Sequence, residues 1–487
     1  SNIYFGYDQA RDMYSALEIV HGNLKLIGPT TAFEGLHHGV LYYYILAPIL
    51  GLTKMNPEVV ATALRIFNAL GIFLIFYLAR VLFNTRVGLL ASLLFAISYE
   101  QSQFSIYMGN PSLAVLSMIV MYLGLALVIF KKKNFGLGLA MLGFGFSVQF
   151  QFALTYLILP LILILVIFRK SFLALSLKTW AVSFGVLIFS LLTFIIAELK
   201  YNFPTIHGLL ALSQFNQHKN LVDIITTYFY TVSRMVTFNF VGSGQITGFV
   251  MMLLLITWIW FVRFREYKIK LIFLSIWFFS LLVTFFINGG VSYLENNVPL
   301  FYPNVGVSVS LLIFMAFLLE KIYLKYKILA VILVLGILFF NIKLIQEINP
   351  KGTMPEIDVQ QGMLLGDEKK VLDYIYSEAN GKPFAVKALT MPLFINTTWS
   401  YLFEWYGKSK FGYLPIWNGK NALGYQGNLR VQEAQEGLPE KRYVIIEPTR
   451  GIAPYLIEDF LKEEGYFTKI VDEKKIGEFI LQKREKI

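Results

Sequence analysis

Long uncharged stretches alternate with short polar connections along the first two thirds of the chain. Residues 112–130 and 179–197 are uncharged runs of 19 residues each, close to the roughly 20 that a helix needs to cross the hydrocarbon core of a bilayer. Apolar periodicity and charge-free length together predict about ten membrane-spanning helices. Their approximate ranges are 58–82, 87–106, 112–130, 134–150, 152–168, 179–197, 245–262, 271–287, 303–319 and 327–343. The expected fold class is therefore a multi-pass α-helical membrane protein.

Two apolar stretches do not fit a simple span. Residues 134–168 carry no charge, but one helix of that length would extend about 52 Å, well beyond the ~30 Å hydrocarbon core. Two shorter helices that turn near 149–151 are expected instead. Residues 39–53 are apolar but short and contain Pro48, so they predict an interfacial or re-entrant helix with the tyrosines at 42–44 at headgroup level.

From about residue 349 the pattern changes to that of a water-soluble domain. Strand-like and helix-like segments alternate at 369–379, 382–390, 442–448, 454–465 and 477–483, and predict a small C-terminal α/β domain. The aromatic-rich segment 397–415 either stacks on sugar rings or forms an apolar core and docking surface. The predicted domains are a first outer loop with interfacial helices (1–57), a transmembrane bundle (58–348) with a long outer loop at 198–244, and the α/β domain (349–487).

Composition agrees with a membrane protein and narrows its chemistry. The 487 residues are 56% hydrophobic and 15% charged, with a mean hydropathy of +0.60. Cysteine is absent, which excludes disulfides, thiolate metal sites and a cysteine nucleophile. The net charge is +11, yet residues 349–487 hold 19 basic and 19 acidic residues. The excess lies in the helical part, where it reports membrane topology rather than nucleic-acid binding.

The basic residues are distributed unevenly over the predicted connections. Five connections, near 80–86, 131–133, 169–178, 263–270 and 321–327, carry 15 basic residues, whereas the connections on the other side carry six. The positive-inside rule then places the first loop and the C-terminal domain outside the cytoplasm, at the plasma membrane. The chain begins without Met in a polar segment and shows no signal peptide, and an upstream transmembrane helix is expected to be missing.

Ionisable and polar side chains gather in the predicted outer loops. They are Asp8, Arg11, Asp12, Glu34, His37, His38, Glu100, Asn110, Glu198, Lys200, His207, His218, Asp223, Glu295 and Tyr302. A carboxylate beside cationic or imidazole groups suits a general base, and the cations suit a phosphate leaving group.

A purely structural role also explains each of these residues. The first acids and Arg11 fit a solvated helix turn, and the adjacent histidines fit loop residues or a weak metal site. Asn110 and Tyr302, each followed by a proline, fit the starts of helices. Spacing alone leaves the function ambiguous.

The segments YDQARD, GLHHGVLYYYILAP and ATALRIFNALGIFLIFYLAR follow one another in residues 4–110. Their order resembles the N-terminal half of the GT-C membrane glycosyltransferases of the protein O-mannosyltransferase and lipid A aminoarabinose transferase superfamily. That group carries an acidic pair, a Lys/His-Pro-Pro-Leu-Tyr-Tyr segment and a span that starts Ala-x-Arg-Leu. YLENNVPLFYP at 293–303 is similar to its Tyr-Pro start of a late span.

The resemblance implies a membrane enzyme that transfers a sugar, with inversion, from a polyprenyl-phosphate donor to a glycan, lipid or protein acceptor outside the cytoplasm. Asp8 would be the general base, and Gln9 stands where the group has its second acid. His38 would contact the donor phosphate, with Gly39 and Val40 in place of the two prolines.

Asn110 stands where many relatives have an acid, and either Lys200 or His207 would supply a cation. The other substrate-binding candidates are Arg11, Asp12, His37 and Tyr302. No cofactor is implied, and a divalent metal is left open. The chain has no Gly-rich nucleotide loop, and the expected partners are the donor, membrane lipids and the acceptor, without nucleic acid.

Two other classes of function compete with the enzyme. A transporter or flippase of lipid-linked saccharides would place ionisable residues and broken helices at the membrane midplane, often in repeated halves. Here Arg65 is the clear intramembrane charge and no repeat is found, which favours the enzyme. A non-catalytic glycan-binding membrane protein would use the aromatic segment 397–415.

Overall fold

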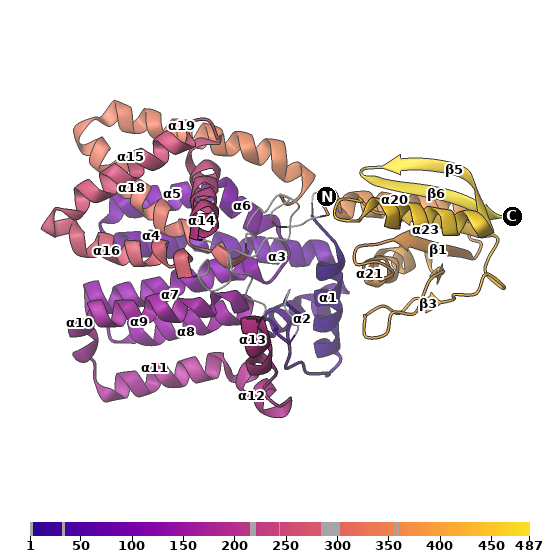
Figure 1. The fold of residues 1–487 in the computed structure, drawn as a ribbon, viewed down its shortest axis with the longest axis horizontal. Coiled ribbons are helices and arrows are strands. Elements are labelled where there is room, and N and C mark those ends of the chain that lie inside the picture. The colour runs from indigo at the N-terminus through magenta and orange to yellow at the C-terminus, as the bar shows by residue number, and fades with distance from the viewer. Residues whose placement is uncertain are drawn as a thin grey trace.

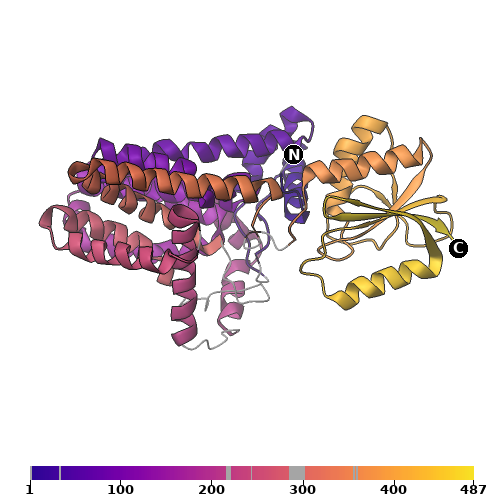
Figure 2. The same cartoon turned by 90° about the horizontal axis from the view of Figure 1, so that it is seen from above.

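The computed structural model describes residues 3–31, 35–214, 221–242, 244–283, 302–354, 357 and 360–487. A bundle of helices makes up the first part of the chain, and a small α/β domain lies beyond one end of it in both Figure 1 and Figure 2. The predicted helical bundle with a C-terminal α/β domain is confirmed. The candidates Glu34, His218 and Glu295 lie outside the described residues.

The bundle contains helices of very different length. They are α1 (Tyr7–Val20), α2 (Leu41–Thr53), α3 (Pro57–Ala69), α4 (Gly71–Leu82), α5 (Thr85–Ile97), α6 (Tyr99–Ile106), α7 (Pro111–Lys131), α8 (Phe135–Phe150), η1 (Phe152–Leu157), α9 (Ile158–Ile167), α10 (Arg169–Leu173), α11 (Leu177–Ser190), α12 (Leu192–Lys200), α13 (Pro204–Gln214), α14 (Leu221–Val236), η2 (Thr237–Val241), α15 (Thr247–Val262), α16 (Arg265–Phe279), η3 (Tyr302–Asn304), α18 (Ser308–Lys325), α19 (Lys327–Ile348) and η4 (Asn349–Lys351).

Three stretches of helix in the described ranges are long and apolar enough to cross a membrane, namely Pro57–Leu82, Pro111–Lys131 and Lys327–Lys351. The bent pair α11 and α12 would make a fourth. The outer face of α19 exposes large apolar side chains, including Ile328, Ile332 and Phe339, as a lipid-facing helix does. The other predicted spans are shorter helices here, so their number stays a prediction.

The predicted span 87–106 is broken at Ser98, which separates α5 from α6. The Ser98 hydroxyl accepts the N–H of Gln101 (3.1 Å) and donates to Asn239 (2.6 Å). The next N–H, that of Tyr99, donates to the side chain of Asn341 (2.8 Å). The break is therefore stabilised because Asn341 of α19 and the Ser98 hydroxyl satisfy backbone N–H groups there, while Asn239 of η2 holds that hydroxyl in place.

The expected turn near 149–151 is confirmed. α8 ends at Phe150, Gln151 is extended, and η1 leads into α9. Gln149 uses its side-chain amide to bond the carbonyl of Ser190 (2.9 Å), at the point where α11 and α12 bend by 58°. The predicted span at 179–197 is therefore a bent pair of helices, and the carbonyl freed by the bend is satisfied from α8.

The C-terminal domain is built on one six-stranded sheet of order β3-β2-β1-β4-β6-β5. Strands β1 to β4 pair in parallel, and β6 pairs antiparallel with both β4 and β5. The elements are α20 (Leu365–Ala379), β1 (Phe384–Leu389), α21 (Thr397–Leu402), η5 (Phe403–Gly407), α22 (Lys408–Phe411), β2 (Ile416–Trp417), β3 (Arg430–Val431), β4 (Lys441–Ile446), α23 (Pro454–Phe467), β5 (Thr468–Ile476) and β6 (Phe479–Lys486).

The aromatic segment 397–415 belongs to the core of this domain and to its contact with α1. Trp399, Tyr401 and Phe403 are buried, and the Tyr401 ring lies 5.3 Å from that of Tyr14 and 5.4 Å from that of Phe5. These buried rings therefore form an apolar core and docking surface, the second of the two roles expected for this segment, and are not free to stack on a sugar.

The two ends of the bundle differ in chemistry. α7 starts beside α1, because Met108 just before it accepts a hydrogen bond from Gln9 (3.1 Å). Its last residue, Lys131, therefore lies at the opposite end, about 30 Å away along the helix. α10, with Arg169 and Lys170, also lies at the end remote from the α/β domain (Figure 1). The cytoplasmic assignment of this basic end stays a prediction.

Candidate active site

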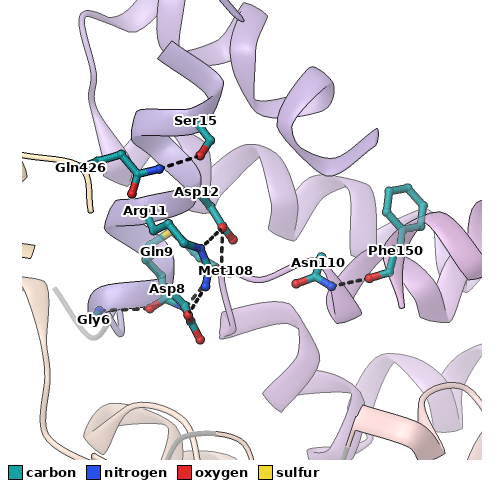
Figure 3. A network of polar contacts seen from close by, with 10 residues as sticks. All are labelled: Gly6, Asp8, Gln9, Arg11, Asp12, Ser15, Met108, Asn110, Phe150 and Gln426. Atoms are coloured by element: carbon teal, nitrogen blue, oxygen red, sulfur yellow. Dashed lines mark hydrogen bonds and ion pairs between the residues drawn. The ribbon is translucent and has the colours of Figure 1, made fainter. Parts of the chain in front are cut away.

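Helix α1 is fixed at its first turn by a side chain that was predicted to bind substrate. The N–H of Gly6 donates to Oε1 of Gln9 (3.0 Å), which caps the helix, and Nε2 of Gln9 donates to the Met108 carbonyl (3.1 Å). Gln9 is buried. Both ends of its amide are thus occupied, and it ties α1 to the segment before α7 (Figure 3).

Arg11 holds two carboxylates on the next turn of α1. Its Nη1 lies 2.7 Å from Oδ1 of Asp8, while Nε and Nη2 lie 3.0 and 2.8 Å from Oδ1 of Asp12. The side chain of Asp8 is 51% exposed, whereas that of Asp12 is 3% exposed. Figure 3 shows the guanidinium of Arg11 between the two carboxylates, of which that of Asp8 is open to solvent and that of Asp12 is buried.

The buried carboxylate of Asp12 also receives a hydrogen bond from Tyr43 of α2. Burial raises the pKa of Asp12 to about 6, while Arg11 opposes this rise. Tyr42 and Tyr43 are buried, because they pack under α1; the headgroup level predicted for the tyrosines stays a prediction. Only the hydroxyl of Tyr44, which donates to Lys25 O (3.1 Å), reaches the loop.

We expect the pKa of Asp12 to make stability depend on pH. Because its folded pKa lies above the ordinary value of 3.8, the native state binds this proton more tightly than the unfolded chain does. The stabilisation is complete below about pH 4 and is lost as pH rises through about 6. The Tm of the wild type should therefore fall over this window relative to that of Asp12→Asn, measured in the same detergent. Parallel Tm curves would contradict it.

His38 lies partly buried at the meeting point of the first loop and α8. Its Nδ1 accepts the N–H of Phe152 (3.1 Å), which leaves the proton of the neutral ring on Nε2. Burial, and then the charge of Arg11, lower the pKa of His38 to about 3. His38 is therefore a neutral donor at pH 7, not a cation.

The structure brings most, but not all, of the predicted residues together. Asn110 is buried and donates to the Phe150 carbonyl; its side chain does not cap α7, although the helix does start at Pro111. The Tyr302 ring lies 6.0 Å from that of Tyr107, and its hydroxyl donates to Ile357 O. The predicted span from 303 starts late, since Ser308 begins α18.

The remaining candidates lie at the edge of this group. His37 is half-buried, and burial lowers its pKa. α13 packs beside it, since Gly208 is in close contact with Gly35 and Leu36. Lys200, 5.3 Å from the Tyr201 ring, and His207 are exposed on α12 and α13. In the described part of the chain, no group of three His, Asp or Glu side chains is placed to hold a metal ion.

Three kinds of partner were missed by sequence reasoning. They are the backbone acceptors Met108 and Phe150, the phenol of Tyr43, and side chains of the C-terminal domain such as Gln426, which approaches Ser15 (3.4 Å). The one available signal was helical spacing. Asp12 follows Asp8 by four residues and Ser15 follows Asp12 by three, so the three side chains form one polar stripe on α1.

Comparisons with known proteins agree with this architecture. Residues 37–195 match the family model described as dolichyl-phosphate-mannose-protein mannosyltransferase. The crystal structures of ArnT from Cupriavidus metallidurans, bound to undecaprenyl phosphate and in the apo state, match with a TM-score of 0.60 at 11% and 10% identity, over 99% of this chain and 94% of ArnT. The Archaeoglobus fulgidus oligosaccharyltransferase in complex with Zn and sulfate matches with a TM-score of 0.50 at 15% identity, over 85% of this chain and 58% of that one. No protein of curated function matches significantly.

These findings confirm the resemblance predicted from the sequence. The chain has the fold of the GT-C glycosyltransferases, and the matched range includes His37, His38 and Asn110. Asp8 and Arg11 lie before that range.

Proposed function

We propose that this chain, which has the GT-C glycosyltransferase fold, transfers a sugar from a polyprenyl-phosphate donor to an acceptor at the extracytoplasmic face of the plasma membrane. The observation that carries the proposal is the pairing of half-exposed Asp8 with Arg11 at one end of the bundle. ArnT, which shares the fold, was solved bound to undecaprenyl phosphate, and this supports a lipid-phosphate donor.

Asp8 is the general base of the proposed reaction. An acceptor hydroxyl attacks the anomeric carbon, its proton passes to the Asp8 carboxylate, and the bond from that carbon to the phosphate oxygen breaks with inversion. Polyprenyl phosphate leaves with the electron pair of that bond. Arg11 keeps Asp8 oriented, since the guanidinium of Arg11 is itself held by hydrogen bonds to the buried carboxylate of Asp12.

The leaving phosphate needs hydrogen-bond donors and positive charge. His38 offers its Nε2–H as a neutral donor, and Arg11 is a cation whose charge acts on His38. We assign Lys200 and His207, exposed on α12 and α13, to the approach of the anionic headgroup. Gln9, Asp12 and Asn110 act by positioning, because their side chains are already bonded within the protein.

A donor panel tests the proposed reaction. Membranes containing the chain are given polyprenyl-phosphate sugars and a mixture of glycan, lipid and peptide acceptors, and release of polyprenyl phosphate is followed by mass spectrometry. We expect release with at least one donor, coupled to a glycosylated product. Movement of intact donor across the bilayer without release would instead indicate a flippase, and glycan binding alone a non-catalytic receptor.

A further inference from the structure

A cleft of about 650 Å³ opens between the first loop and the C-terminal domain. This volume lies in the range of roughly 300–1,000 Å³ that is usual for ligand sites. We call it the α1 cleft; its lining includes Tyr14, Glu18, Lys54, Glu404, Tyr425 and Gln426. Helices α1 and α2 form one wall, and residues 425–428 form the other.

The wall at 425–428 is held rigidly. Glu404 accepts hydrogen bonds from the Tyr14 hydroxyl (3.0 Å) and from the backbone and side-chain nitrogens of Asn428 (3.1 and 3.2 Å). The hydroxyl of Thr397 donates to the Gln426 carbonyl (2.6 Å). Gly427 approaches α21 so closely that a Cβ there would lie 2.7 Å from the Ser400 hydroxyl oxygen. The cleft is therefore a preformed site rather than a gap between loose loops.

The chemistry of the lining fits a neutral polyhydroxylated ligand. Glu18 is neutralised by Lys25 at 2.5 Å. The lining holds one further acid, Glu404, and one lysine, Lys54, so the charges of the cleft sum to about zero. The amide of Gln426 and the carboxylate of Glu404 offer donors and acceptors for hydroxyl groups. Tyr425 is 47% exposed, and an exposed tyrosine ring offers an apolar face on which the C–H face of a sugar can pack.

One stripe of α1 joins the cleft to the proposed base. Residues 7, 11, 14 and 18 follow one another at helical spacing on α1, so they share this stripe, and residues 14 and 18 line the cleft. The Tyr425 ring lies 6.0 Å from the ring of Tyr7, and Arg11 lies 5.5 Å from the same ring. Arg11 in turn binds Asp8 at 2.7 Å. Tyr425, which lines the cleft, is therefore connected to the Arg11–Asp8 pair through Tyr7.

We propose that the α1 cleft binds the acceptor and that the acceptor is a neutral glycan. This inference rests on the proposed sugar transfer, and it narrows the acceptor to one class. The glycan lies along α1 with a ring on Tyr425, and its reactive hydroxyl reaches Asp8. The balanced charge of the cleft disfavours acceptors that carry several phosphates or carboxylates.

Glycan binding can be measured without any sugar donor. The full chain in lipid nanodiscs is applied to an array of neutral and anionic oligosaccharides, as wild type, Tyr425→Ala, Tyr425→Phe and Tyr455→Ala. Tyr455 is the matched control, since it is 62% exposed in the same domain and lies outside the cleft. We expect Tyr425→Ala to weaken binding of neutral glycans by about tenfold or more, while Tyr425→Phe and Tyr455→Ala bind as the wild type does.

Three results would overturn the inference: no glycan bound by the wild type, equal binding by Tyr425→Ala, or binding of anionic glycans alone. The Tm of each variant shows that its fold is kept. Since the array holds no donor, glycan binding without any sugar transfer would contradict the proposed function alone. Sugar transfer without glycan binding would contradict this inference alone.

Discussion

Asp8→Asn is expected to lower the rate of sugar transfer by about 100-fold or more, because a positioned general base contributes roughly 10²–10⁴-fold. The amide keeps the size of the side chain but cannot take the proton of the acceptor hydroxyl. The measurement is release of polyprenyl phosphate at saturating donor and acceptor. Asp8→Glu, which keeps a displaced carboxylate, should retain part of the rate.

This variant isolates the carboxylate from the rest of the cluster. Arg11 remains bound to Asp12 through two N–H groups, so the guanidinium is expected to stay in place. Asp8 is half-exposed, and exposed ion pairs contribute only about 0–1 kcal/mol, so the Tm should change little. Glu58→Gln is the matched control, because Glu58 is 38% exposed and pairs with Lys369 at 3.2 Å. Equal rates for wild type and Asp8→Asn would remove Asp8 from the chemistry.

Those elements that depend on local pattern were predictable. The span 112–130 is α7, and the strand at 382–390 and the helix at 454–465 are β1 and α23. β5 was missed because its sequence, TKIVDEKKI, is mostly charged and its side chains are exposed between its ends. It is an edge strand that pairs only with β6, and charges on such a strand prevent pairing with other chains.

The breaks within the helices could not be read from local pattern. Ser98 interrupts an apolar run because Asn239 and Asn341, 141 and 242 residues away, bond to that turn. Similarly, the roles of Gln9 and Asn110 depend on backbone carbonyls 99 and 40 residues away. Family resemblance could suggest Asp8 and His38, but only the fold shows that Gln9, Asp12 and Asn110 are already bonded within the protein.

The loop that carries His38 depends on two glycines. Gly39 donates its N–H to the Gln149 carbonyl (2.8 Å), which a proline could not do. A Cβ on Gly39 would lie 2.7 Å from the Cα of Gln149. A Cβ on Gly28 would lie 2.6 Å from the carbonyl oxygen of His38. Two glycines thus let the loop lie directly against itself and the end of α8.

Gly28→Ala and Gly39→Ala are therefore expected to displace His38 and to abolish most sugar transfer. In both variants the added methyl meets backbone atoms, so the loop itself must move. The destabilisation should be about 1–3 kcal/mol, as for overpacked cores, and it is measured as a fall in Tm in detergent. Gly185→Ala is the control, since a Cβ there meets nothing within 4 Å and its Tm should be unchanged or higher. Wild-type rates and Tm in both loop variants would show that the close approach does not hold His38 in place.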